Sequence, residues 1–302
     1  MELRHIRYFL AVAEEENFTR AAARLGIGQP PLSLQIRDLE REVGVQLFHR
    51  VPHGAELTEA GRSFLAAVKG LPGAAEQAKQ AARRAAGGMT GQLSLGYSGS
   101  VALNPLFPAA IRAFRRDYPD VVLSLSEINS VGLIARLVDG SLDVGLVRPS
   151  SADPDTLEIR PLMTERLVAA VPSSHVAAAA QGPVKLTVLK DDAFILTPRA
   201  IGVSLHDATL AACRAAGFDP LLGQPAPQIA TILSLIAAET GVALVPETMR
   251  QFNIRGVAFL DVAAPEPQQV LAVAHRRALP SATAQNFARL IRKIAAGRQS
   301  AT

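Results

Sequence analysis

The most constraining feature of the chain is residues 18–39, which read as two short helices joined by a glycine-containing turn. Gly26 favours the left-handed conformation that ends a helix. Pro30 and Pro31 fix backbone angles suited to the start of the next helix, where a missing N–H costs nothing. This pattern predicts a helix-turn-helix, the arrangement that places its second helix in the major groove of DNA.

The second of these helices has an apolar and a polar face. Its apolar stripe consists, at helical spacing, of Leu32, Ile36, Leu39 and Val43. The opposite face would meet DNA and carries Pro30, Leu34, Arg37 and Arg41, with Ser33 on its flank. An ordinary corner of two helices with solvated arginines is the alternative source of such a pattern. Agreement between stripe, turn and double proline favours the DNA-binding interpretation.

The neighbouring segments complete a winged helix. Leu3, Ile6 and Leu10 predict a preceding helix that covers the same core. Residues 45–57 predict a hairpin that turns at residues 52–54. We expect base-edge contacts from Gln29, Ser33 and Arg37, and phosphate contacts from Arg50, Arg20 or Arg24. The predicted DNA-contacting set is Arg20, Gln29, Pro30, Pro31, Ser33, Leu34, Arg37, Arg50 and His53.

Several segments of this region carry a family resemblance. They are Phe18-Thr19-Arg20-Ala21-Ala22, Gln29-Pro30-Pro31-Leu32-Ser33, Gly44-Val45-Gln46-Leu47-Phe48 and Leu57-Thr58-Glu59-Ala60-Gly61. With them, residues 1–65 closely resemble the N-terminal domain of LysR-type transcriptional regulators. The resemblance implies a homodimeric or homotetrameric cytoplasmic regulator that binds a two-fold promoter site, works with RNA polymerase, and senses a small molecule through its C-terminal domain.

Two positions depart from that family pattern. Many regulators resembling this one carry arginine at the position of Leu34, and often at the position of His53. Leucine cannot form a bidentate contact with guanine, although it can contact the methyl group of thymine. The base preferred at the Leu34 contact is therefore left open by the sequence.

Charge and composition limit the remaining possibilities. Residues 1–62 hold 8 arginines against 9 acidic residues, so placement rather than net basicity identifies the DNA-binding face. The single cysteine, Cys213, excludes a disulfide within one chain and is expected to be a small buried hydrophobe. We expect a cytoplasmic protein, because the first residues lack the apolar core of a signal peptide and no apolar run is long enough to span a bilayer.

A linker is predicted between the winged helix (residues 1–58) and the rest of the chain. Residues 59–91 are rich in alanine and include a heptad seam, which predicts a long helix that pairs with a second copy. Packing of this helix on its own chain is the alternative. Pro72-Gly73 predicts a kink near Leu71, and the glycines at 87, 88 and 91 predict a hinge. The predicted dimerisation residues are Phe64, Val68, Leu71, Ala75 and Ala78.

Residues 92–302 alternate between predicted strands and helices, which indicates an α/β domain with a largely parallel sheet. Pro161 and the Pro265-Glu266-Pro267 cluster suggest points at which the chain passes between two lobes. The resemblance implies an effector domain similar to periplasmic solute-binding proteins. Its first lobe would comprise residues 92–162 and 268–302, and its second lobe residues 163–267.

Ligands in open α/β sheets bind beyond the carboxyl ends of strands, where this chain places hydroxyls and one arginine. Hydroxyls at helix starts, free N–H groups and a fixed cation describe an anion site, so a small carboxylate is the favoured ligand. In regulators resembling this one, the positions of Ser100, Ser130 and Arg148 contact carboxylate inducers, often metabolites of aromatic degradation. The predicted effector-binding residues are Ser98, Ser100, Ser130, Arg148, Thr197 and Val203.

Each of these positions also fits another role. Each hydroxyl could simply cap a helix, and Arg148 could pair with Asp143 or Asp155. The effector could be something other than a carboxylate, or absent. An enzyme is the rival class, since residues 96–100 nearly match a nucleophile elbow, but the fifth residue is serine where glycine is required. We expect no catalytic residues, no cofactor and no metal, because the six histidines lack metal-ligand spacing.

Overall fold

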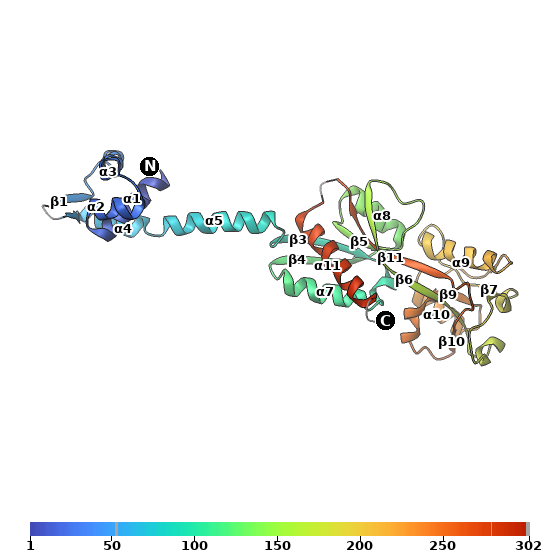
Figure 1. The fold of residues 1–302 in the computed structure, drawn as a ribbon. Helices are drawn as coiled ribbons and strands as arrows, with labels where there is room; N and C mark the ends of the chain where they lie inside the picture. Colours follow the sequence, from blue (N-terminus) through green and yellow to red (C-terminus); the bar gives the residue numbers. More distant parts are fainter. Residues whose placement is uncertain (52–53, 279, 300–302) are drawn as a thin grey trace. The chain divides into compact units, whose positions relative to one another are not determined.

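The computed structural model describes residues 1–51, 54–278 and 280–299. It contains two compact units, a head unit of residues 1–84 and a C-terminal unit of residues 85–302, which are described separately (Figure 1). In the part of the chain that the structure describes, no helix has the length and apolar character needed to cross a membrane.

The head unit begins with three helices and a two-stranded wing. Asn17 caps the second helix by accepting hydrogen bonds from two backbone N–H groups, and Gly26 ends it at φ +67°. Pro30 and Pro31 lie in the first turn of the third helix, and Gly44 ends it at φ +84°. The elements are α1 (Leu3–Glu15), α2 (Phe18–Leu25), α3 (Gln29–Val43), β1 (Phe48–Val51), β2 (Gly54–Leu57), α4 (Glu59–Val68) and α5 (Leu71–Ala86).

The core of the head unit is built from the apolar faces of the first three helices. Leu32, Ile36 and Leu39 of α3 are almost fully buried, as their helical spacing predicts, whereas Val43 is exposed. Ala21 and Ala22 of α2 are also buried, which allows the close crossing with its neighbours. The structure therefore confirms the predicted winged-helix fold, in which β1 and β2 form the antiparallel hairpin of the wing.

The expected dimerisation seam is divided by the structure. Phe64 packs edge-on against Phe9 at a ring-centroid distance of 4.9 Å, and Val68 is 4% exposed. These two side chains lie in the core of the head unit instead of on an exposed seam, because α4 contacts α1. The other seam residues lie on α5, which has no buried residue and exposes 41% of Leu71; they are Leu71, Ala75 and Ala78.

The expected kink and hinge also take other forms. The kink near Leu71 is a break, because α4 ends at Val68 and α5 starts anew with Pro72 in its first turn. The glycine hinge is held in place within the C-terminal unit. There the side-chain amide of Asn286 donates to the carbonyl of Gly87 at 2.9 Å. Gly88 packs closely on α11 (Ala282–Gln299), because a Cβ added to it would lie 2.6 Å from the backbone carbonyl carbon of Ala282.

The C-terminal unit is a two-lobed α/β domain, as predicted. Its strands are β3 (Gly91–Tyr97), β4 (Val121–Glu127), β5 (Val144–Val147), β6 (Leu157–Pro172), β7 (Ala193–Phe194), β8 (Leu221–Leu222), β9 (Ala243–Pro246), β10 (Val257–Leu260) and β11 (Gln268–Arg276). Its α-helices are α6 (Gly99–Ala102), α7 (Leu106–Asp117), α8 (Ser130–Asp139), α9 (Val203–Ala215), α10 (Ile229–Ala237) and α11 (Ala282–Gln299). Three short 3-10 helices are η1 (Val176–Ala179), η2 (Leu186–Leu189) and η3 (Glu247–Gln251).

The prediction of a largely parallel sheet is wrong. The strand order is β10-β6-β11-β5-β3-β4, with β9 also paired to β6. In the described part of the chain, β3–β4, β3–β5 and β7–β8 are parallel, whereas every ladder that involves β6 or β11 is antiparallel. The reason is that β11 pairs with both β5 and β6 and runs antiparallel to each of them, while β6 continues into the second lobe and is antiparallel to its partners there. Pro161 is accommodated inside β6 at a register shift opposite Leu271 and Ala272.

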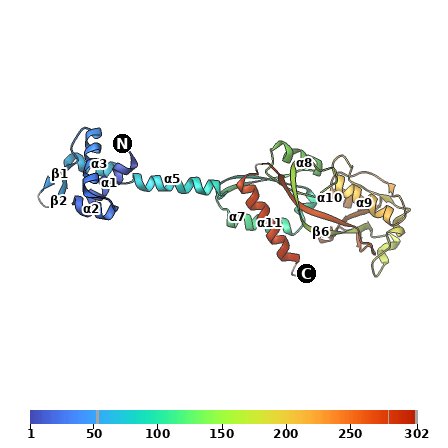
Figure 2. The same cartoon turned by 45° about the horizontal axis from the view of Figure 1, so that its top comes forward.

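Successive side chains along each strand point to opposite faces of the sheet, and in each lobe helices cover both faces. In the first lobe, α7 and α11 lie side by side on one face, while α8 covers the other (Figures 1 and 2). In the second lobe, Leu167 and Ala169 of β6 point to the core that contains Cys213 of α9, whereas Val168 and Ala170 point to the core beneath α10. Both lobes therefore have separate cores, and β6 and β11 connect them.

Candidate DNA interface and ligand site

The outer face of α3 presents an apolar side chain between polar ones. Leu34 is 53% exposed, and Arg37 one turn later is also exposed. Pro30 and Pro31 are exposed at the start of the same helix. A partner that binds this face can therefore make van der Waals contact with Leu34 and a hydrogen bond or ion pair with the guanidinium of Arg37.

Ser33 is placed differently from our expectation. It was predicted on the flank of the outer face, but it is only 7% exposed. Its hydroxyl accepts a 2.9 Å hydrogen bond from the side-chain amide of Gln29, one turn earlier. Two of the three side chains predicted to read bases, Gln29 and Ser33, are thus hydrogen-bonded to each other in this structure.

The arginines of the head unit differ in whether an acidic group accompanies them. Arg20 pairs with Glu15 at 3.5 Å, and Arg24 bonds to Glu14 at 2.6 Å, which raises the pKa of the Arg24 guanidinium. Among the described residues, Arg37 makes no ion pair. Arg37 is therefore available to a phosphate or base without first leaving an intramolecular partner.

The wing is positioned by residues that sequence reasoning missed. One carboxylate oxygen of Glu40, on α3, accepts from the backbone N–H groups of Leu47 and Phe48 at 2.8 and 3.1 Å. A Cβ on Gly54 would lie 2.2 Å from the carbonyl oxygen of Glu16, so only glycine fits there. Arg50, on β1, places its Cζ 5.3 Å from the ring centroid of Phe18. His53, also predicted to contact DNA, lies outside the described residues.

Three of the six predicted effector residues meet in the first lobe. The hydroxyls of Ser98 and Ser100 lie 3.4 Å apart at the end of β3, and Nε of Arg148 donates to Ser100 at 3.4 Å. Neither acidic residue suggested by the sequence pairs with Arg148. Its partner is Glu165 of β6, at 2.8 Å, and both side chains are less than 5% exposed.

The ion pair joins the two lobes. Arg148 directly follows β5 in the first lobe, whereas Glu165 also accepts a 2.6 Å hydrogen bond from the hydroxyl of Thr248 in η3 of the second lobe. Two buried ions need further hydrogen bonds to offset their loss of hydration. Thr248 provides one for Glu165, and Ser100 provides a long one for Arg148.

The remaining predicted effector residues are placed elsewhere. Thr197 accepts, through its carbonyl, from Nδ1 of His206 at 2.9 Å, and Val203 is the first residue of α9 rather than part of the preceding loop. These two lie together in the second lobe. Ser130 begins α8, and no hydrogen bond within the described ranges joins its side chain to the other five.

A cavity of about 440 Å³ lies between the lobes beside this cluster. None of the six predicted residues lines it, but Pro149 and Ser204, which directly follow Arg148 and Val203, do. Gln269 of β11 also lines it and donates to the hydroxyl of Ser204 at 2.8 Å. The wall further contains Ser150, Ser151, Pro161, Asp207 and Val270.

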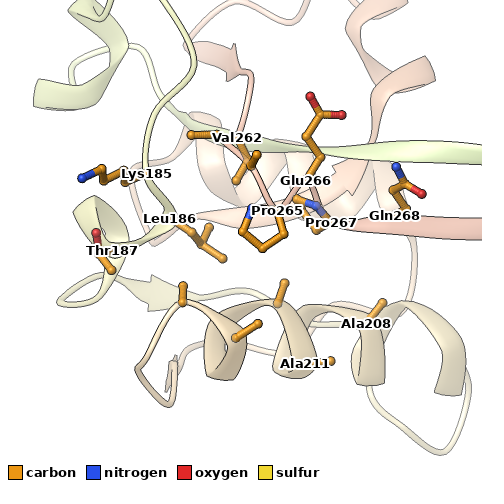
Figure 3. Close-up of a pocket in the computed structure, with 15 residues that line it drawn as sticks. Lys185, Leu186, Thr187, Ala208, Ala211, Val262, Pro265, Glu266, Pro267 and Gln268 are labelled. Carbon is orange, nitrogen blue, oxygen red and sulfur yellow. The ribbon is translucent and has the colours of Figure 1, made fainter.

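A second cavity, also about 440 Å³, lies within the second lobe (Figure 3). Pro265 and Leu186 lie across from the alanine-bearing face of α9, where Figure 3 labels Ala208 and Ala211. This wall is largely apolar and contains none of the predicted effector residues. Lys185 and Glu266 bring one charge of each sign to this wall, and no arginine lines it.

The buried residues Glu165 and Gln269 and the half-buried Thr248 were not predicted from the sequence. Glu165 and Arg166 interrupt an otherwise apolar run that ends at Pro172, and this interruption was the available signal. In the part of the chain that the structure describes, no cluster of three or more histidine, cysteine, aspartate or glutamate side chains could hold a metal ion.

A winged helix followed by a two-lobed α/β domain defines a class: DNA-binding transcriptional regulators with an effector-binding domain. The family described as "Bacterial regulatory helix-turn-helix protein, lysR family" matches residues 3–62, and "LysR substrate binding domain" matches residues 86–296. The chain belongs to the LysR family of transcriptional regulators. It is a regulator rather than an enzyme, so residues 96–100 are not a nucleophile elbow.

Known proteins similar to the chain agree with this assignment. The uncharacterized regulator YnfL of Escherichia coli is 37% identical over 87% of this chain and 88% of its own length. The regulator IlvR of Caulobacter vibrioides is 36% identical, covering 96% of this chain and 97% of its own. Full-length CbnR, solved in complex with its target DNA, superposes with a TM-score of 0.76 at 28% identity and covers 98% of this chain and 100% of its own.

Proposed function

We propose that a small carboxylate, bound between the lobes at Arg148, controls DNA binding by this regulator. The observation that carries the proposal concerns Nη1 of Arg148. This nitrogen is buried, yet it has no hydrogen-bond partner among the described residues. Buried polar groups almost always have a partner, so an unpaired one calls for a ligand or a bound water. A carboxylate accepts from guanidinium with favourable charge and geometry. Ser98 and Ser100 add hydroxyls beside it, whereas Ser130, Thr197 and Val203 would line the rest of the site.

Sequence recognition rests on α3. Gln29 and Ser33 exchange their mutual hydrogen bond for base edges, Arg37 reads a base, and Leu34 contacts a thymine methyl group. Arg20, Arg50 and His53 bind phosphate, and Pro30 and Pro31 approach the backbone at the helix start. Selection of binding sites from random DNA should yield a different base at one position when Leu34→Arg replaces the parent. An unchanged selected sequence would show that Leu34 is not a reader.

The protein acts as a homodimer or homotetramer on a two-fold DNA site in the cytoplasm, where it contacts RNA polymerase. The exposed face of α5 supports pairing, since Leu71, Ala75 and Ala78 recur at heptad spacing with no buried contact of their own. Analytical ultracentrifugation of Leu71→Glu should show a weakened assembly, while Gln77→Glu on the same helix serves as the charge-matched control.

The ligand acts by changing the relative populations of two arrangements of the lobes. A carboxylate that binds one arrangement more tightly makes it dominant, and a ligand with equal affinity for both changes nothing. Because Asn286 of α11 holds the carbonyl of Gly87 just beyond α5, movement of the first lobe is passed to the end of that helix.

Thermal unfolding with a panel of acetate, succinate, benzoate and cis,cis-muconate tests the carboxylate site. At least one member should raise the melting temperature of the parent but not of the double variant Arg148→Met/Glu165→Leu, which removes both buried charges together. Arg160→Ala, at an exposed arginine of the same unit, should behave like the parent. Stabilisation of no protein, or equal stabilisation of parent and double variant, would favour a regulator with a non-carboxylate effector or none.

A further inference from the structure

Two side-chain atoms in the described part of the chain are buried without a hydrogen-bond partner, and they have opposite character. One is the donor nitrogen Nη1 of Arg148, and the other is the acceptor oxygen Oε1 of Gln269. Arg148 is 6% exposed and Gln269 is 5% exposed. An unpaired buried donor and an unpaired buried acceptor each destabilise the protein, and one ligand that carries both complementary groups would satisfy them together.

The fold brings these two residues to the same place. Gln269 of β11 stands directly opposite Glu165 of β6 in the antiparallel ladder, so their side chains share one face of the sheet. Glu165 is the ion-pair partner of Arg148. The carboxylate of Glu165 is therefore the common neighbour of both residues at the crossing between the lobes.

Each residue already uses part of its hydrogen-bonding capacity within the protein. Arg148 donates through Nη2 to Glu165 and through Nε to Ser100, which leaves Nη1. Gln269 donates through Nε2 to Ser204 at the start of α9, which leaves Oε1. The unpaired atoms are thus oriented by partners from both lobes.

The adjoining cavity has room and chemistry for a ligand with two polar groups. Gln269 and Ser204 line it, together with Pro149, the residue after Arg148. Its wall also contains the hydroxyls of Ser150 and Ser151. Asp207 in the same wall is held by a bidentate pair with Arg199, so its charge is already matched within the protein.

We infer that the ligand of this cleft is a carboxylate that also carries a hydrogen-bond donor, as in a hydroxy acid or an amino acid. The carboxylate accepts from Nη1 of Arg148, and the hydroxyl or ammonium group donates to Oε1 of Gln269. This inference rests on the proposed carboxylate function and adds Gln269 as the residue that selects among carboxylates. A site built to bond a ligand hydroxyl discriminates against the analogue that lacks it, because the buried acceptor is then left unpaired.

Calorimetric titration of the full chain with two matched series tests the inference. One series is pentanoate, 2-hydroxypentanoate and 2-aminopentanoate, and the other is phenylacetate, mandelate and phenylglycine. In at least one series, a donor-bearing member should bind about tenfold or more tightly than the member without a donor. Comparison of the hydroxyl with the amino member identifies which donor the site takes.

Variants of Gln269 assign the preference to its oxygen. Gln269→Met keeps the length of the side chain and should reduce the preference to within about twofold, while leaving affinity for the donor-free carboxylate unchanged. Gln269→Glu should shift the preference toward the amino member, since a carboxylate favours an ammonium group. The variant Gln92→Met, at an exposed glutamine of β3 that lines neither cavity, is the matched control and should keep the parental preference.

The outcomes separate this inference from the proposed function. If donor-free acids bind in an Arg148-dependent way and the hydroxyl and amino members bind no better, the inference is overturned while the carboxylate site stands. A preference that persists in both Gln269 variants also overturns it. If no acid of either series binds, and no member of the carboxylate panel raises the melting temperature, the carboxylate site and the inference fail together.

Discussion

The two units of this regulator use arginine in opposite ways. On the recognition helix of the head unit, Arg37 is exposed and has no ion-pair partner among the described residues. In the C-terminal unit, Arg148 is buried against Glu165 at the crossing between the lobes. An exposed arginine is ready for a large polyanion at little cost, whereas a buried arginine with one nitrogen unpaired is prepared for a small ligand of matching shape.

The largest expected effect comes from separating the buried pair. Arg148→Met should lower the free energy of unfolding of the C-terminal unit by about 3–5 kcal/mol, because it leaves the carboxylate of Glu165 buried without its counterion. Adding Glu165→Leu should restore most of that loss. Urea denaturation followed by circular dichroism measures both. A single variant within about 1 kcal/mol of the parent would mean that water already screens the pair.

Next in size is the contact between the wing and Glu16, the residue that follows α1. Gly54→Ala places a Cβ 2.2 Å from the carbonyl of Glu16, so the hairpin must move, at a cost of about 1–3 kcal/mol in the stability of the head unit. Gly73→Ala in α5 is the control, since its Cβ would meet no atom within 4 Å. It should leave the head unit unchanged or slightly more stable. Thermal unfolding of both variants decides, and equal melting temperatures would contradict the close approach.

A smaller effect is expected from the exposed arginines. Arg37→Ala should weaken binding to specific DNA by about 1–2 kcal/mol in an electrophoretic or anisotropy titration. Arg41→Ala, which removes a cation paired with Asp38 on the same helix, should cost less. The reverse order would move the reading surface toward the end of α3.

The smallest effect concerns the cysteine. Burial raises the pKa of the Cys213 thiol to about 11, with a further contribution from the charge of Asp219. Since the thiolate is the reactive form, iodoacetamide at pH 8 should leave Cys213 unmodified in the folded protein and modify it in urea. Mass spectrometry measures the outcome. Rapid modification of the folded chain would place Cys213 at an accessible surface.

The same contrast explains how far the sequence could predict the structure. The recognition helix was predictable because the spacing of Leu32, Ile36 and Leu39 and the glycine that ends α2 are local features. The wing hairpin was predicted for the same reason. By contrast, Ser33 was misplaced, because its burial depends on how tightly α3 packs into the core of the head unit.

The ligand site depends on contacts that local patterns do not encode. Arg148 and the two serines were predicted from their position after strands, but its partner was not, since Glu165 comes from the strand that crosses between the lobes. Pro161 was predicted as a point at which the chain passes between the lobes, whereas it lies inside β6, a single strand that continues from the first lobe into the second. Gln269 became visible only when the register of β11 against β6 was known.

If a carboxylate at Arg148 controls this regulator, its binding changes how the protein occupies DNA. DNase I footprinting of the full chain on a selected two-fold site, with and without the best-binding carboxylate of the panel, measures this change. We expect the footprint of the parent to change in length or in its hypersensitive positions, and that of Arg148→Met/Glu165→Leu to stay constant. A parental footprint that is identical with and without a carboxylate shown to bind would mean that the ligand at Arg148 does not control DNA occupancy.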